Sequence, residues 1–395
     1  MSALVQIFIC TLITIGIICS YTLSTYTVIY HKYDDFHFVM RELIVGMVSI
    51  GVMWKLAQLD PDIWLHRLGI GLFILGMALM IIMPFLPESL VNEVGGAKRW
   101  ITLPGFSLAP VEFFKIGFVY FLAWSFSRKF VHHHEISIKD EFIRFLPYAS
   151  IFFIAVFLIA FLQNDLGQVV VLASTLAIML LFAGSSALFF SYLIVGSSSI
   201  FLVIILTSEN RMNRVLAWWQ GAQNTILAIL PESMAQHLRT QSAEEPYQIG
   251  HSLNAIHNGG IFGTGLGGGT FKLGFLSEVH TDFVLAGIAE EFGFIGVFVV
   301  TMFFAAMLFR IFKIAGRSEN NIYYLFSLGV GLLITFAFMI NAYGISGMIP
   351  IKGIAIPFIS YGGSAMLASA IGIGMVLMIS KKASGVHHRN NSDEE

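Results

Sequence analysis

The sequence has few charged residues. Only 12% of its 395 residues are charged, against about a quarter in a typical soluble domain, whereas 56% are hydrophobic and the mean hydropathy is +0.79. This imbalance excludes an ordinary soluble domain and makes a lipid bilayer the expected solvent. The formal net charge of -2, with basic residues scattered over short loops, also excludes a nucleic-acid partner.

Cysteine is nearly absent, and a cleavable leader is not apparent. The two cysteines, Cys10 and Cys19, both lie in the first apolar run, so no disulfide framework is expected. The amino terminus lacks the basic region and the small-residue cleavage site of a signal peptide. The first apolar run is therefore expected to be a retained membrane span.

What the sequence has in abundance is long apolar runs. A helix needs about 20 apolar residues to cross the hydrocarbon core. Runs of this kind lie near residues 4–23, 40–59, 68–87, 110–127, 145–163, 166–184, 186–207, 283–309, 322–344 and 363–380. Two are less clearly bounded, because only Gly184-Ser185-Ser186 parts the sixth from the seventh and because the eighth contains Glu290 and Glu291. The pattern predicts an all-α integral membrane protein with about ten transmembrane helices.

Lysine and arginine beside the short loops predict the orientation. They all fall on one side of the predicted bundle, at Lys55, Arg67, Arg128, Lys129, Lys139, Arg144, Arg310, Lys313, Arg317, Lys381 and Lys382. Such residues mark the cytoplasmic side, so both termini are expected there. We expect residues 1–380 to form the membrane domain and residues 381–395 a polar, disordered cytoplasmic tail.

Four unusual segments fall on the opposite, extracytoplasmic side, namely 88–109, 163–165, 208–281 and 345–362. Loops held by a rigid scaffold are where function concentrates. The large loop 208–281, between the seventh and eighth helices, contains Trp218-Trp219 and the apolar run 226–230, which favour a partly helical cap along the membrane surface.

Within that loop, residues 259–269 are rich in glycine and contain a formal G-x-G-x-x-G from Gly263 to Gly268. A dinucleotide-binding function is excluded, because that motif has meaning only between a strand and a helix of a βαβ unit. Two interpretations stay open: close backbone approach with positive-φ turns beside a ligand, or plain loop flexibility.

Asp282 follows the glycine-rich loop, at the mouth of the eighth span. An ionisable group there is costly unless it faces a cavity or a partner, which favours a functional role. The alternative is a helix N-cap, for which aspartate is well suited.

The positive-inside rule predicts few basic residues on the extracytoplasmic side. The sequence nevertheless places six there, namely Lys98, Arg99, Arg211, Arg214, Lys272 and Lys352. Fixed cations of this kind suit a diphosphate. For Lys98, Arg211 and Lys272, a solvated or headgroup-facing position is an equally good interpretation.

Three further groups of polar residues have competing interpretations. Glu112 and Lys115 share a helix face, as a structural ion pair or as part of a substrate cavity. Glu290 and Glu291 point to different faces, so at least one is expected to be structural. The run 132–134 of three histidines lies in a predicted cytoplasmic loop, and metal binding there is disfavoured because consecutive side chains diverge.

Several motifs, in order along nearly the whole chain, resemble those of the SEDS family of shape, elongation, division and sporulation proteins. They are Lys98-Arg99-Trp100-Ile101, Pro110-Val111-Glu112-Phe113-Phe114-Lys115, Asn164-Asp165-Leu166-Gly167, Tyr247-Gln248-Ile249 with Ser252, His280-Thr281-Asp282-Phe283, and Pro357-Phe358-Ile359-Ser360-Tyr361-Gly362-Gly363-Ser364. The family's patterns differ here at Val111, at Ser277 and at Gln168, and none of these departures removes a charged motif residue.

The resemblance implies ten membrane helices and a peptidoglycan glycosyltransferase that acts on lipid II. It implies as partners a class B penicillin-binding protein, an FtsI-like transpeptidase, and other membrane proteins of the divisome. The family's catalytic aspartate corresponds to Asp282 and its motif arginine to Arg99. Pro350-Ile351-Lys352-Gly353 resembles the division branch more than the elongation branch, which implies a role at the septum of the bacterial inner membrane.

The implied reaction needs a base for the acceptor hydroxyl and cations for the departing diphosphate. We expect Asp282 to be the base and Arg99, Arg214 and Lys352 to stabilise the leaving group. Substrate contacts are also expected from the motif residues Lys98, Glu112, Lys115, Asp165, Gln248 and His280. A divalent cation, Mg²⁺ or Mn²⁺, is compatible with this chemistry, although no ligand cluster encodes one. The alternative functions are a lipid II flippase and a non-catalytic divisome scaffold.

Overall fold

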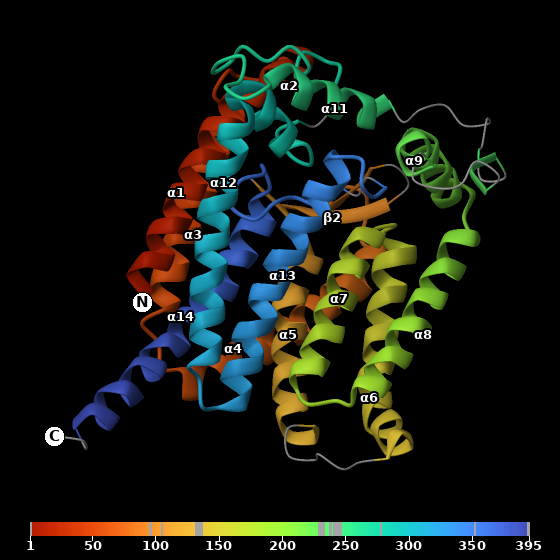
Figure 1. Ribbon diagram of the computed structural model, residues 1–395. Coiled ribbons are helices and arrows are strands. Elements are labelled where there is room, and N and C mark those ends of the chain that lie inside the picture. Colours follow the sequence, from red (N-terminus) through yellow and green to blue (C-terminus); the bar gives the residue numbers. More distant parts are fainter. Residues whose placement is uncertain are drawn as a thin grey trace.

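The structure is a bundle of long helices that run along one axis (Figure 1). This computed structural model describes residues 2–94, 97–103, 106–130, 137–227, 234–236, 239, 247–276, 279–350 and 353–392. Ten long helices form the bundle: α1 (Ser2–Leu23), α3 (His37–Leu56), α4 (Pro61–Ile82), α5 (Pro110–Lys129), α6 (Ile138–Val156), α7 (Leu166–Phe182), α8 (Ala187–Leu206), α12 (Val284–Gly316), α13 (Asn321–Ile345) and α14 (Gly363–Ser392). The predicted all-α membrane fold with about ten helices is confirmed.

Seven spans in the described residues are long and apolar enough to cross a membrane by composition alone; these are built on α1, α4, α6, α8, α12, α13 and α14. The other three bundle helices, α3, α5 and α7, do not meet these criteria of length and hydropathy. Charges lie within α3, at Arg41 and Glu42, and within α5, at Glu112 and Lys115, while α7 is shorter. Most of the α5 residues are buried, so this central helix meets protein rather than lipid.

Helix boundaries follow local capping chemistry. The third span begins at Pro61, seven residues before its predicted start, because the Asp60 side chain accepts a hydrogen bond of 3.0 Å from Asp62 N and proline suits the first helical position. The predicted break between α7 and α8 is confirmed: Gly184 has a φ of 98°, and Ser186 is the N-cap of α8.

The carboxyl-terminal tail differs from the prediction. Residues 381–392 continue α14 as a helix rather than forming a disordered end. The start of this extension is anchored to the turn between α3 and α4, because Lys381 Nζ donates to Gln58 O over 2.8 Å and Lys382 forms an ion pair with Asp62. These contacts stabilise α14 at Lys381 and Lys382, where its apolar sequence ends and its polar sequence begins.

At the opposite end of the bundle, the shorter elements form a cap (Figure 1). It includes α2 (Thr25–His31), α9 (Glu209–Leu227) and α11 (Tyr247–Gly259), with η1 (Met83–Phe85) and the π-turn η2 (Phe157–Leu162) at the ends of α4 and α6. The prediction that residues 208–281 are partly helical is confirmed. We call this end of the molecule the cap end.

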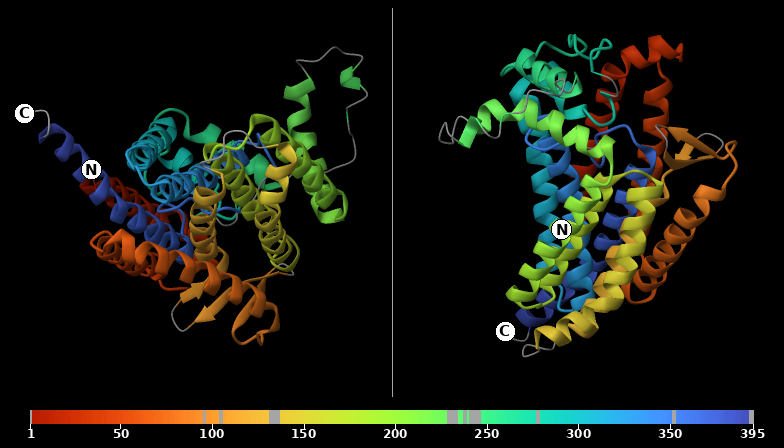
Figure 2. Two further views of the ribbon diagram at one scale, coloured as in Figure 1. Left: turned by 90° about the horizontal axis from the view of Figure 1, so that it is seen from below. Right: turned by 90° about the vertical axis from the view of Figure 1, so that its right-hand side faces the viewer.

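A small antiparallel sheet, which the sequence analysis did not predict, also lies at the cap end. It contains β1 (Val91–Val94), β2 (Ala97–Leu103) and β3 (Phe106–Leu108) in that order. Val91 faces Ile101, which faces Leu108, and these apolar residues pack with Met83 of η1. Figure 2 shows the sheet projecting beside the bundle. Its strands are too short and too interrupted by glycine and proline for the period-2 pattern to be evident.

The glycine-rich loop closes a break in α12. Gly293 has a φ of 66° and interrupts the helix. The loop supplies the missing partners: Thr264 N donates to Glu290 O, and Phe294 N donates to Gly260 O, each over 2.9 Å. A Cβ on Gly263 would lie 2.2 Å from Glu291 O, so only glycine allows this approach. The predicted close approach and positive φ are confirmed at Gly263, with the α12 backbone as the partner, while a ligand beside the loop stays a prediction.

We expect Gly293→Ala to lower the thermal midpoint of the detergent-solubilised protein by several degrees. A Cβ there would meet Gly263 N at 2.4 Å, and the positive φ adds strain of about 1–3 kcal/mol. Differential scanning fluorimetry measures the shift. Gly71→Ala is the control, because a Cβ on Gly71 would meet nothing within 4 Å. Equal midpoints for both variants would contradict the close packing of the glycine-rich loop on the break in α12 as a source of stability.

Candidate active site

Asp282 lies in the turn that precedes α12 at the cap end. The helix begins at Val284, and its N-cap is Phe283, without a side-chain capping bond. The alternative interpretation of Asp282 as the N-cap is therefore wrong. Its carbonyl oxygen instead accepts a hydrogen bond of 2.7 Å from Nδ2 of Asn341, a residue of α13 that is buried within the bundle. The Asp282 side chain is half-buried.

An irregular segment, residues 353–362, packs against this turn. Asn341 Nδ2 also donates to Ile354 O over 2.7 Å, and Tyr361 N donates to His280 O over 2.8 Å. The Asp282 carboxylate lies directly against Gly353, where an added Cβ would meet Oδ2 at 2.5 Å. Non-helical backbone survives at such a position only when protein or water satisfies its polar groups. These contacts hold Asp282 against the irregular segment.

His280, two residues before Asp282, is buried between aromatic rings. Its ring centroid lies 4.8 Å from that of Phe38 and 5.6 Å from that of Tyr361. Burial raises the pKa of the Tyr361 hydroxyl, and a hydrogen bond with Arg41 opposes that shift. Arg41 therefore contributes a positive charge on the same side of the turn.

A second polar group lies in the bundle interior, where Glu112, Lys115 and Gln168 form a closed triangle. Lys115 Nζ lies 2.8 Å from Glu112 Oε2 and donates to Gln168 Oε1 over 2.7 Å. Gln168 Nε2 donates to Glu112 Oε1 over 2.8 Å. The predicted ion pair between Glu112 and Lys115 is confirmed, and the amide of Gln168 completes it.

Asp165 and Arg99 extend this group toward the cap end. Asp165 is the N-cap of α7, and its Oδ1 accepts from Gln168 N over 3.2 Å. Burial raises the pKa of the Asp165 carboxyl, and the nearby guanidinium of Arg99 opposes the shift. Arg99 Nε and Nη2 donate to Gln163 O and Asn164 O over 2.8 and 2.9 Å. Arg99 thus binds the end of the π-turn η2.

The two groups border the same piece of irregular backbone. A cavity of about 20 Å³ lies between the ion-pair triangle and the irregular segment and has room for roughly one water molecule. Its polar lining comes from Glu112, Lys115, Gln168 and Ser369, and the irregular segment contributes Ile354, Ala355 and Pro357. Residues 353–357 therefore meet the Asp282 carboxylate at one end and the ion-pair triangle along their length.

The other predicted cations and Gln248 lie outside these two groups. Lys98 Nζ donates to Pro84 O and Leu86 O, and Arg211 donates to Ala160 O and Ile204 O, so both bind helix ends. Arg214 on α9 and Gln248 at the start of α11 are exposed. Lys352 falls outside the described residues.

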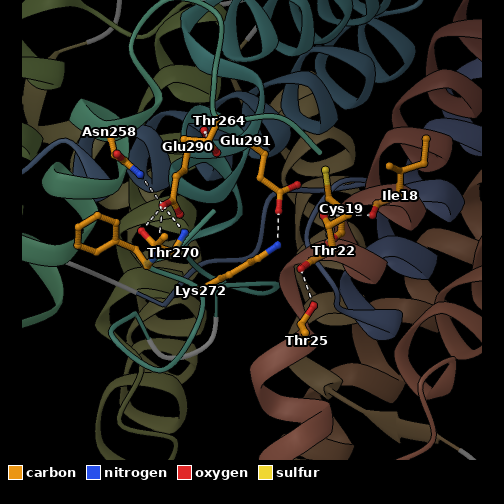
Figure 3. Close-up of polar contacts among 11 residues, drawn as sticks. Ile18, Cys19, Thr22, Thr25, Asn258, Thr264, Thr270, Lys272, Glu290 and Glu291 are labelled. Atoms are coloured by element: carbon orange, nitrogen blue, oxygen red, sulfur yellow. Dashed lines mark hydrogen bonds and ion pairs between the residues drawn. The ribbon is translucent and has the colours of Figure 1, made fainter. Parts of the chain in front are cut away.

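Glu290 and Glu291 have separate structural partners (Figure 3). Glu290 Oε1 accepts from Asn258 Nδ2, Thr270 N and Phe271 N. Glu291 Oε1 lies 2.6 Å from Lys272 Nζ, and both side chains are buried. The prediction that the two carboxylates do not share one pocket is confirmed, and Lys272 is the buried partner of one of them.

Sequence reasoning missed Gln168 and Asn341 as site residues. In the sequence, Gln168 stands out only as a departure from a family motif, whereas in the structure its amide joins Glu112 to Lys115. Asn341 is a buried polar residue within an otherwise apolar span, and that pattern alone marks a position with an obligatory hydrogen-bond partner.

No metal centre is evident in the described part of the chain, where no three histidine, cysteine, aspartate or glutamate side chains come together. The histidine run 132–134 lies outside the described residues.

Comparison with known proteins identifies the family. The family model of the FtsW, RodA and SpoVE cell cycle proteins matches residues 2–385. The chain belongs to this family. A relative from Helicobacter pylori named probable peptidoglycan glycosyltransferase FtsW is 49% identical over 384 residues, which cover 96% of this chain and 99% of the relative. A protein of the same name from Trichlorobacter lovleyi is 32% identical, over 93% of this chain and 90% of its own length.

Solved structures of the family share the fold. Thermus thermophilus RodA, a rod shape determining protein, is 20% identical and has a TM-score of 0.65 over 96% of both chains. A chain from a peptidoglycan synthase complex, studied for the coordination of polymerization and crosslinking, gives a TM-score of 0.69 at 20% identity, over 96% of this chain and 97% of that one. Together they confirm the family's membrane architecture in this chain.

We expect Lys115→Met to destabilise the protein by about 3–5 kcal/mol, because it leaves the Glu112 carboxylate buried without its cation. Thermal unfolding in detergent measures the loss. The double variant Glu112→Gln with Lys115→Met is the control: without either charge, most of the lost stability should return. A double variant as unstable as the single one would contradict the pairing as the source of the effect.

Proposed function

We propose that this protein polymerises lipid II into glycan strands at the outer face of the cytoplasmic membrane during septal wall synthesis. The observation that carries the proposal is the Asp282 carboxylate, held against the irregular segment at Gly353 at the cap end. The family, and relatives named as probable peptidoglycan glycosyltransferases, support the reaction class.

The proposed step is a direct displacement. The 4-hydroxyl oxygen of the acceptor sugar attacks the anomeric carbon of the donor, and the bond from that carbon to the diphosphate oxygen breaks. Asp282 takes the hydroxyl proton as general base, and undecaprenyl diphosphate leaves with the bonding pair. Asp282 is suited to this role by its held position, because fixed geometry supplies much of the rate enhancement.

Cations at the cap end would stabilise the departing diphosphate. Within the described residues, Arg99 uses Nε and Nη2 for backbone carbonyls, which leaves Nη1 for a phosphate oxygen. Arg214 is exposed on α9, and Lys352 directly precedes Gly353 in the sequence. We assign leaving-group stabilisation to these three residues.

The orientation follows from the distribution of charge. Both termini lie toward the end of the bundle opposite to the cap (Figure 1), and the helix ends and the connection after α12 there carry eleven of the 22 lysine and arginine residues. We infer that this end is cytoplasmic and that the cap end, with Asp282, faces outward. Lipid II sugars displayed on the outer leaflet could then reach the site.

A class B penicillin-binding protein is the proposed partner, together with other membrane proteins of the divisome. A family structure comes from a complex that couples polymerization with crosslinking, which supports a transpeptidase partner here. The Lys352 motif favours the septal, FtsI-like type over the elongation type.

The alternative functions are a lipid II flippase and a non-catalytic divisome scaffold. A lipid II flippase should place its functional charges at mid-membrane or at both ends, as transporters do. Here Asp282, Arg99 and Arg214 lie at the cap end, and the interior charges Glu112 and Lys115 are paired with each other and with Gln168, which favours the enzyme. A scaffold, in contrast, would keep its function without the Asp282 carboxylate.

We expect Asp282→Asn to lower polymerisation of labelled lipid II by about 10²–10⁴-fold or more, because the base is lost while the shape is kept. Polymer is measured on gels with the purified complex of this protein and its transpeptidase. Glu88→Gln, which removes an exposed carboxylate at the same end, is the matched control. Equal polymer from Asp282→Asn and wild type would refute the base assignment, and no polymer from an intact wild-type complex would favour the flippase or scaffold.

We also expect Gly353→Ala to reduce kcat by about tenfold or more while the KM for lipid II changes little. The new methyl group would displace the Asp282 carboxylate, and a shift on the order of 1 Å can cost about 100-fold in rate. Gly362→Ala is the control in the same segment, because its nearest neighbours would lie 3.7 Å away. Steady-state polymerisation kinetics would contradict this expectation if both variants matched wild type.

A further inference from the structure

A continuous ladder of aromatic rings leads from the surface of the cap to the turn that holds Asp282. Its members come from α2, the loop after it, the first turn of α3, and the two segments around the candidate base; we call Tyr26, Tyr30, His31, Tyr33, Phe38, His280 and Tyr361 the aromatic ladder. Consecutive ring centroids lie 4.8–5.8 Å apart along it. Tyr361 closes the inner end, 5.0 Å from Phe38.

The ladder runs from solvent into the protein. The exposed fraction falls from 68% at Tyr30 to 44% at Tyr33, 7% at Phe38 and 3% at His280. The outer rings therefore offer a surface to a ligand, and the inner rings anchor that surface to the backbone beside Asp282. Tyr26 is fixed to the cap as well, because its ring lies against Gly274.

The chemistry of this surface suits a sugar chain. The C–H face of a pyranose packs on an aromatic ring, and its hydroxyl groups need polar partners at the rim. Rigid tyrosines supply large contact areas together with a polar hydroxyl. The exposed residues Lys32, Asp34 and Asp35 flank the outer rings with both donors and acceptors.

A lipid headgroup is the competing occupant, because tyrosine is common where a protein meets the membrane surface. Two observations favour a glycan. The ladder does not stay at one level but turns inward to His280 and Tyr361. In addition, the exposed charges beside the rings are mixed, with Asp34 and Asp35 close in sequence to Lys32, so this surface is not the basic patch that anionic headgroups favour.

We propose that the aromatic ladder binds the glycan strand as it extends from the site at Asp282. This inference rests on the proposed function, because it takes the polymer made at Asp282 as the ligand. The ladder holds the strand by ring contacts, so that successive additions occur before the product dissociates. Its outer rings take no part in the chemical step.

The test uses Tyr30→Ala and Tyr33→Ala, with Tyr30→Phe and Tyr33→Phe as ring-retaining partners and Phe262→Ala as a control for an exposed aromatic at the same end. Strand length is read on gels from labelled lipid II with the intact complex. We expect the alanine variants to make strands about two- to tenfold shorter at an unchanged rate of first addition. The phenylalanine variants and Phe262→Ala should keep the wild-type length.

Strands of wild-type length from both alanine variants would overturn the proposal. A lower melting midpoint or poorer liposome incorporation, with strand length unchanged, would also overturn it and would assign the rings to the membrane surface.

A second measurement separates this inference from the proposed reaction. Saturation-transfer NMR follows binding of uncross-linked glycan strands of four disaccharides to the Asp282→Asn protein, with and without Tyr30→Ala and Tyr33→Ala. Ring-dependent binding would support the ladder even if no polymerisation were found. Equal binding with and without the two alanine substitutions would overturn the inference even if polymerisation were established.

Discussion

A polar group that the bundle removes from water must find its partner within the protein, and the irregular parts of this structure are built around that constraint. The break in α12 is closed by the backbone of the glycine-rich loop. The carbonyls at the π-turn η2 are bound by Arg99 and Arg211. The irregular segment 353–362 is tied to α13 by the single amide of Asn341. Each departure from regular helix thus depends on a specific side chain or loop, and each lies at the cap end.

This constraint explains how the carboxylate that we propose as the base is held in a half-buried turn. Asn341 Nδ2 binds the backbone oxygen of Asp282 and that of Ile354, so the turn and the irregular segment are held by one donor group. The Asp282 carboxylate lies against Gly353, whose missing side chain leaves room for it. The triangle of Glu112, Lys115 and Gln168 supports the other side of the segment with balanced charge. This arrangement fixes the position of the Asp282 carboxylate.

The sequence predicted the helices and the paired charges well, because both depend on local spacing. Apolar runs of membrane length and the i, i+3 relation of Glu112 and Lys115 are visible in one dimension. The missing parts depend on contacts between distant segments. Nothing near Gly263 indicates that its partner is the α12 backbone, and nothing near Gln168 indicates that its amide bridges a pair on α5. Asn341 could have been singled out as a polar residue in an apolar span, but its two acceptors could not.

Several basic residues at the cap end bind backbone carbonyls and so stabilise the structure around the site. Arg99, Arg211 and Lys98 were grouped as basic residues, yet all three bind backbone carbonyls at helix ends, where a cation is favoured by the helix dipole. Of these, Arg99 also lies beside Asp165, so its charge acts on a buried carboxyl as well as on the helix end. A cation already fixed by backbone acceptors loses little side-chain freedom when a phosphate binds. The observed contacts of Arg99 are therefore compatible with the role toward a diphosphate that we propose for it.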